Sequence, residues 1–376
     1  MIIQTQIAIT IISILCLQTL VLSVLLILKG RNKQSYFLLA LVLIFFGLTE
    51  GNLALFFSLY TNDLSEFIPY LRLELIFGLG PTLYLYSKSV TNPEYKIKKW
   101  EYLHFLPVIL EFIYYRTLFY RLGVINLPAK PQSIYESIFI FEQWIGVISA
   151  TIYMILAIKV LFDYKKWLNN NFSNLQNKTL HWLNKPIIAF VSFWSLWFIV
   201  RLSDMYIFSG TYSDYYSYPM FILLSVISLW IGFQGYSKTQ IDTTGFLAKR
   251  NSDHDRVSID QDYSEIISQI KEKLEKDKLY LDQDLSITAF SLKIGISTKL
   301  ISRAINTELK INFHKFINQY RVNEFKNRVA AENSNNLTLL AHAFDSGFSS
   351  KSTFNDIFKK LTKLTPKEYY SQIHKK

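Results

Sequence analysis

The sequence of 376 residues contains a single cysteine, Cys16, which lies in an apolar run. One thiol excludes a disulfide framework and any metal site built from paired cysteines. The chain also lacks a GxxxxGK phosphate loop and an HExxH zinc motif, and its six histidines are scattered. Neither the glycine boxes nor the phosphoacceptor region of a sensor kinase is present. The sequence therefore predicts no catalytic residues, no metal site and no cofactor.

Acidic residues are also in short supply, with 29 Asp and Glu against 40 Lys and Arg. The imbalance is concentrated after Asp284, where 15 basic residues face 6 acidic ones. Long apolar runs, in contrast, lie almost entirely before Gly235. A basic segment of this kind is either a solvated surface or one that attracts phosphate groups.

Two stretches of this basic segment, Leu285–Ile305 and Leu337–Phe358, share one pattern. Each begins with a helical spacing of apolar residues that runs into a glycine, and a serine and a second helical segment follow. Glycine permits the left-handed backbone that ends a helix, and serine caps the next one. Together these features predict a helix-turn-helix layout, whose second helix fits a DNA major groove. The glycines and serines are Gly295, Ser297, Gly347 and Ser350.

The segment between the two stretches, Asn312–Ala330, keeps aromatic and aliphatic residues at helical spacing. A helix of this length spans about 28 Å. Successive major grooves on one side of DNA lie about 34 Å apart. We therefore expect one chain to read two adjacent turns of the duplex.

Five stretches carry a likeness to a known family. They are IGIS at Ile294–Ser297, ISRAI at Ile301–Ile305, FINQYRV at Phe316–Val322, DSGFSSKSTFNDIFKK at Asp345–Lys360 and LTPKEYY at Leu364–Tyr370. With these motifs, about 100 residues of the chain resemble the DNA-binding domain of AraC/XylS-type transcription regulators. Four positions depart from the family pattern: Lys310 and Lys363 replace glycines, His342 replaces an aliphatic residue and Phe325 an alanine. At a fifth, Asp356 stands where arginine is usual.

The resemblance implies which side chains face DNA. Two recognition helices would present them to successive grooves, and the last two lysines of the second helix would contact phosphate. The implied DNA-binding residues are Thr298, Lys299, Ser302, Arg303, Lys351, Ser352, Asn355, Asp356, Lys359 and Lys360.

Seven segments before Gly235 are long and apolar enough to span a bilayer. The first is too long for a signal peptide and is expected to be a retained anchor. The segments are Ile7–Leu28, Tyr36–Leu59, Ile68–Val90, Leu103–Tyr120, Ile138–Phe162, Pro186–Phe208 and Tyr218–Phe233.

Loop charges predict the orientation of these spans. Lysine and arginine follow the first, third, fifth and seventh spans, whereas acidic residues or tyrosines follow the second and sixth. Because cytoplasmic loops carry the excess of positive charge, the N-terminus is expected outside and the C-terminus in the cytoplasm. The inferred location is a bacterial inner membrane.

Charged residues also occur within or at the margins of the spans. Charge in hydrocarbon is costly, so these groups are expected to pair with one another, to line a signal-sensing pocket or to form an ion path. The candidate sensing residues are Glu50, Arg72, Glu74, Glu111, Arg116, Glu142, Arg201 and Asp204.

The sequence thus predicts an all-α protein with three parts. A seven-helix sensor bundle occupies residues 1–236, a polar linker 237–262 and an AraC-type DNA-binding domain 263–376. The expected function is that of a membrane-bound one-component transcription regulator, with double-stranded DNA, the lipid bilayer and a small-molecule or envelope signal as partners. A homodimer is expected when the protein is active. The alternative is a transporter or receptor whose C-terminal tail docks other proteins.

Overall fold

A computed structural model describes residues 2–30, 33–59, 72–92, 94–119, 132–176, 180–209, 213–237, 263–331 and 337–374. These residues form helices joined by short turns, and none of them lies in a β-strand. The chain divides into two compact units. The first contains Met1–Phe162 and Leu180–Leu247, and the second contains Asp163–Thr179 and Ala248–Lys376. Most of the expected linker, residues 238–262, lies outside the described residues.

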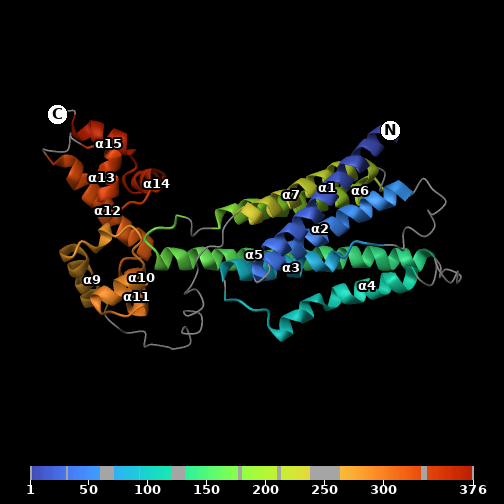
Figure 1. Ribbon diagram of the computed structural model, residues 1–376, viewed down its shortest axis with the longest axis horizontal. Helices are drawn as coiled ribbons and strands as arrows, with labels where there is room; N and C mark the ends of the chain where they lie inside the picture. Colours follow the sequence, from blue (N-terminus) through green and yellow to red (C-terminus); the bar gives the residue numbers. More distant parts are fainter. Residues whose placement is uncertain are drawn as a thin grey trace. The chain divides into compact units, whose positions relative to one another are not determined.

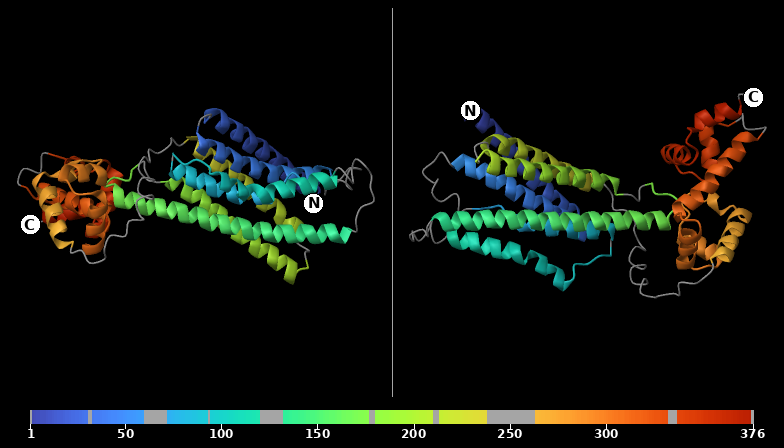
Figure 2. Two further views of the ribbon diagram at one scale, coloured as in Figure 1. Left: turned by 90° about the horizontal axis from the view of Figure 1, so that it is seen from below. Right: turned by 180° about the vertical axis from the view of Figure 1, so that it is seen from behind.

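The helices of the first unit are long and lie alongside one another (Figures 1 and 2). α1 packs against α2 and α7, and α2 packs against α3. One close approach is at Gly232 of α7, where an added Cβ would lie 2.5 Å from Leu22 of α1. The elements are α1 (Ile2–Lys29), α2 (Gln34–Leu59), α3 (Ile76–Thr91), the 3-10 turn η2 (Lys99–Phe105), α4 (Leu106–Phe119), the first part of α5 (Gln132–Asn171), α6 (His181–Ile207) and α7 (Ser213–Ser237).

Five helices in the described part of the chain are long and apolar enough to cross a membrane. They correspond to the first, second, fifth, sixth and seventh expected spans. The third and fourth expected spans are represented by α3, with 16 residues, and α4, with 14, which are shorter than the roughly 20 residues that a straight crossing requires. Arg72 to Leu75 are not helical, and α3 begins at Ile76. The structure therefore supports several apolar spans without reaching the expected seven.

The second unit contains seven α-helices among its described residues, besides the last turns of α5. Its two hydrophobic cores share the central helix α12, which gives Phe313, Phe316 and Ile317 to the first core and Val322, Phe325 and Val329 to the second. The elements are α9 (Ser264–Lys276), the 3-10 turn η4 (Leu279–Leu281), α10 (Ile287–Ile294), α11 (Thr298–Glu308), α12 (Phe313–Ala330), α13 (Leu339–Asp345), α14 (Lys351–Thr362) and α15 (Pro366–Ile373).

One sequence expectation about this unit is confirmed. The joining helix expected at Asn312–Ala330 is α12, with Asn312 as its N-cap. α9 buries Ile267, Ile270 and Leu274 in the first core, as the opening helix of a domain does.

Candidate nucleic-acid interface

The first helix pair consists of α10 and α11. α10 ends at Gly295, whose φ of 74° is left-handed and whose N–H donates to the Ser291 carbonyl at 2.9 Å. The Ser297 hydroxyl then accepts the N–H of Leu300 at 3.3 Å and caps α11. Two residues therefore suffice to end one helix and begin the next.

The second helix pair, α13 and α14, repeats this arrangement. Gly347 has a φ of 91°, and Ser350 caps α14 by accepting the N–H of Thr353 at 3.2 Å. Gly347 is also tightly enclosed, because an added Cβ would lie 2.5 Å from the Tyr280 carbonyl oxygen. The turn of the second pair thus packs on the loop that precedes the first.

The first set of expected DNA-binding residues lies on α11. Thr298, Lys299 and Arg303 are partly exposed. Ser302, however, is only 7% exposed, and its hydroxyl accepts a hydrogen bond from Asn306 of the same helix at 3.3 Å. The expectation that Ser302 faces a groove is therefore not supported, since its side chain is turned inward.

The second set lies on α14, and all six of its members are exposed. Lys351, Ser352 and Asn355 occupy the first half of the helix. Near its end, the Lys360 ammonium lies 2.6 Å from a carboxylate oxygen of Asp356, one turn away. The departure from the family pattern at Asp356 therefore places an acid beside one of the two expected phosphate contacts.

The other departures from the family pattern are at two left-handed backbone positions and two buried positions. Lys310 and Lys363 follow α11 and α14 and have φ values of 51° and 66°, the left-handed backbone that favours glycine. His342 is buried at 5% exposure, and Phe325 fills the second core at 0%. The backbone and the core thus keep the form that the resemblance implies while the side chains differ.

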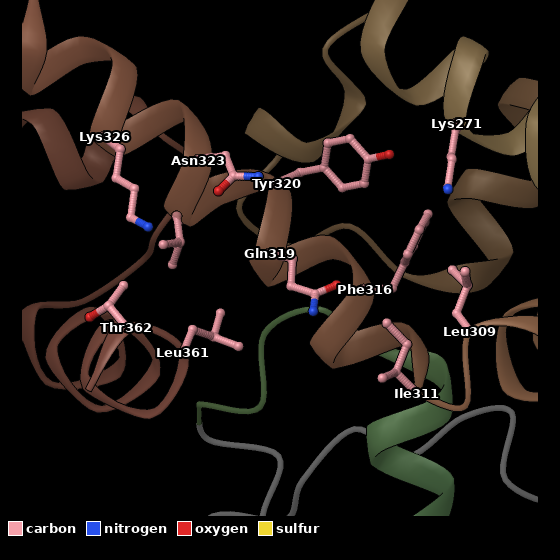
Figure 3. A pocket seen from close by; sticks show the side chains of 11 residues that line it. Lys271, Leu309, Ile311, Phe316, Gln319, Tyr320, Asn323, Lys326, Leu361 and Thr362 are labelled. Carbon is pink, nitrogen blue, oxygen red and sulfur yellow. The ribbon is translucent and has the colours of Figure 1, made fainter. Parts of the chain in front are cut away.

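A groove of about 530 Å³ lies between the two helix pairs and is lined by one face of α12 (Figure 3). Gln319, Tyr320, Asn323 and Lys326 of α12 line it. His314, Asn318 and Arg321 fall on the opposite face of the helix, given 3.6 residues per turn. On that second face Asn318 and Arg321 are buried and His314 is partly buried, and the three residues form a polar cluster.

At the centre of this cluster is Arg321, which is 2% exposed. Its Nε donates to the Tyr280 carbonyl at 2.7 Å, and its Nη2 donates to the Asp282 carbonyl at 2.6 Å. Burial lowers the pKa of Arg321 to about 10, so the guanidinium remains charged at neutral pH. Arg321 is not among the site residues predicted from the sequence, because nothing local distinguishes it from the exposed cations of the same segment.

Five of the candidate sensing residues form one group in the first unit. Arg72 lies 3.0 Å from Glu74 and 3.5 Å from Glu142, and the Arg116 guanidinium donates to the Arg72 carbonyl. Glu111 accepts the N–H of Ile76 at 2.9 Å and so caps the start of α3. These contacts join α4, α5 and the segment before α3, and they are of the kind expected for interhelical pairing.

The remaining three candidates lie apart from this group. Glu50 is fully buried and accepts the Ser228 hydroxyl at 3.0 Å, while its second oxygen has no hydrogen-bond partner among the described residues. On α6, Arg201 donates to the Tyr216 hydroxyl at 3.2 Å, and that hydroxyl donates to Asp204 at 3.1 Å. The eight residues therefore belong to three separate polar groups and do not form a single pocket.

The family match lies in the second unit. Residues 290–372 match the family model described as a helix-turn-helix domain. An uncharacterized HTH-type transcriptional regulator of Staphylococcus aureus strain COL is 32% identical over 92 residues, which are 24% of this chain. A protein of the same description from strain MSSA476 is 30% identical over a stretch of the same length. The chain spans only 12% of the length of each relative, and no solved structure matches it.

Proposed function

We propose that the protein is a membrane-bound one-component transcription regulator that binds double-stranded DNA through two helix-turn-helix motifs. The observation that carries the proposal is the repetition of one capped helix pair at each end of α12. The helix-turn-helix match over residues 290–372 supports it, as do the cations on α11 and α14. α12, with 18 residues, spaces the two pairs by about 27 Å.

In this proposal, some side chains of the two recognition helices contact bases and others contact phosphates. Arg303 on α11 and Lys351 on α14 are the first choices for base contacts, with Thr298, Lys299, Ser352 and Asn355 beside them. Lys359 is assigned to phosphate, which positions the protein without reading sequence. Lys360 contacts phosphate only in competition with Asp356, 2.6 Å away.

We further propose that the first unit spans the inner membrane with its N-terminus outside. Five spans and seven spans are both odd numbers, so either count leaves the two ends of the chain on opposite sides. The excess of lysine in alternate loops favours a cytoplasmic C-terminus, where the DNA lies. The exposed apolar side chains of α1 and α5, such as Leu17 and Phe162, would contact lipid.

In this proposal, the charged groups of the first unit sense the signal. Glu142 belongs to α5, the helix that continues to Asn171, and it pairs with Arg72 on another segment. A ligand that changes this pairing would change the position of α5. Replacement of Glu111 or Arg201 by glutamine is expected to alter promoter response in cells while leaving the protein's intrinsic affinity for DNA unchanged.

The direct test uses the full chain in lipid nanodiscs and a duplex selected by that chain from a random-sequence pool. We expect retention of the selected duplex in a gel-shift assay, with an affinity that falls steeply as salt rises. A scrambled duplex of the same composition is the control, and a footprint longer than the two adjacent turns that one chain can read would indicate the active dimer. No retention of any duplex at low ionic strength, or a C-terminal tag located outside the cell, would contradict the proposal.

A further inference from the structure

The residues that follow the last turn of α5, here called the α5 extension (Phe172–Gln176), pack inside the second unit. Ser173 is 0% exposed there and Asn174 is 7% exposed. Burial of polar residues in a connecting segment is unusual, because loops ordinarily run over the surface. The α5 extension is therefore held in place by specific partners.

Ser173 uses all of its polar atoms in this site. Its N–H and hydroxyl both donate to the Leu285 carbonyl, at 3.1 and 2.7 Å. The same hydroxyl accepts from Arg321 at 3.0 Å, and the Ser173 carbonyl accepts from Asn318 at 2.9 Å. A buried residue with every donor and acceptor satisfied specifies one position, since each lost bond leaves a buried polar group unpaired.

The partners of the α5 extension come from both helix pairs. Phe172 forms an antiparallel bridge with Ser286, the residue that caps α10. Gln176 accepts from Ser349 at 3.3 Å, and Ser349 lies in the turn between α13 and α14. The extension thus contacts the beginning of the first pair, the turn of the second pair and the helix that joins them.

We propose that the α5 extension is the input site through which α5 acts on the DNA-binding unit, an inference that rests on the function proposed above. α5 is continuous from Gln132 to Asn171, and Ser137–Asn171 is apolar enough to span a membrane. The seated extension holds the loop before α10 through Ser173 and Arg321 and the turn before α14 through Gln176. Withdrawal of the extension frees this loop and this turn together, so one displacement alters both DNA contacts.

The seating of the extension is tested by disulfide trapping in the full chain, with Cys16 replaced by serine. Residues opposite each other in an antiparallel bridge have Cα atoms about 4.5–5.5 Å apart, within the range that a disulfide accepts. We expect Phe172→Cys with Ser286→Cys to oxidise rapidly. The matched control joins Phe172→Cys to Ser297→Cys, the serine that caps α11. Equal oxidation of both pairs, or of neither, overturns the proposal.

The coupling is tested with two buried serines. Ser173→Ala removes the hydroxyl's hydrogen bonds to the Leu285 carbonyl and from Arg321, whereas Ser346→Ala removes only a bond to the His342 carbonyl in the helix that Ser346 caps. We expect Ser173→Ala to speed hydrogen exchange in residues 279–286 and 347–350 and to weaken binding of the selected duplex about three- to tenfold. Ser346→Ala should change binding less than about twofold. Equal effects of the two variants overturn the coupling. A wild-type chain that binds no duplex would instead refute the proposed function, and trapping and exchange would still report on the extension.

Discussion

The Nη2 atom of Arg321 lies 3.0 Å from the hydroxyl oxygen of Ser173, although the two residues are 148 positions apart. The same guanidinium binds the carbonyls of Tyr280 and Asp282, and its Nε would lie 3.1 Å from a Cβ added at Gly347. One buried cation therefore touches the α5 extension, the loop before α10 and the turn before α14.

Replacement of Arg321 by alanine is expected to destabilise the second unit by more than about 3 kcal/mol, because several buried carbonyls lose a charged donor. Arg328→Ala is the matched control. Arg328 is one-third exposed and binds Glu324 at 2.8 Å, so its loss should cost about 1 kcal/mol or less. Pulse proteolysis in urea measures both costs, and similar values would show that Arg321 does not organise the unit.

The two turn glycines should respond differently to alanine. Gly295 has no atom within 4 Å of its added Cβ, so Gly295→Ala carries only the left-handed backbone cost of about 1–2 kcal/mol. Gly347→Ala adds a collision with the Tyr280 carbonyl at 2.5 Å and should be clearly more destabilising. The measurement is the denaturant midpoint of unfolding for each variant. A smaller decrease of the midpoint for Gly347→Ala than for Gly295→Ala would contradict this prediction.

Stability of the second unit should fall in mild acid through His314. Burial lowers its pKa, as do the nearby charges of Arg321 and Lys360, while a hydrogen bond to the Ser173 backbone opposes them. Because the folded pKa lies below the ordinary value of about 6.5, the unfolded chain binds more protons in that range. The contribution of the neutral His314 side chain to stability is complete above a pH of about 6.5 and is lost as the pH falls through the folded pKa.

The measurement for His314 is the urea midpoint of the second unit at a series of pH values below neutrality. His314→Gln keeps a polar side chain and cannot titrate, so its midpoint should fall less with acid than that of the wild type. Parallel pH profiles for the two proteins would exclude His314 as the source.

Substitutions of a base-contacting residue and of a phosphate-contacting residue should affect DNA binding differently. Arg303→Ala is expected to cost about 1–3 kcal/mol of binding and to relax preference at one base position, whereas Lys359→Ala should weaken all sequences about equally. Selection of duplexes from a random pool by each variant distinguishes the two outcomes. If both variants select and bind as the parent does, the assignment of contacts fails.

Asp356→Asn offers a gain-of-binding test. The change releases Lys360, whose ammonium lies 2.6 Å from the Asp356 carboxylate in the wild type, and it removes a negative charge from α14. Affinity for DNA should rise, and the salt dependence should steepen by about one phosphate contact. Glu308→Gln at the end of α11 controls for the loss of one negative charge elsewhere. Equal gains in the two variants would point to net charge alone.

The elements of the second unit followed from local chemistry. The ends of these helices depend on the local backbone of Gly295 and on the side chains of Ser297 and Ser350, so the roles of these residues were predictable from sequence. Ser302 and Ser173 were not, because a serine gives no local sign of whether it faces water or a buried arginine. Contacts between residues 148 positions apart depend on the tertiary fold.

The first unit shows the same division. Hydropathy located the five long helices, but it also extended the third segment back to Ile68, whereas α3 begins at Ile76. Arg72 and Glu74 precede the helix and bind each other, and Glu111 caps its first N–H groups. An average of hydropathy over a window cannot detect that an acidic residue on another helix caps the first residues of α3.

The two hydrophobic cores of the second unit have α12 in common and otherwise draw on different helices. Each half therefore has an interior of its own. Because local opening follows such packing units, hydrogen exchange of residues buried in one core is expected to be separable from that of residues buried in the other.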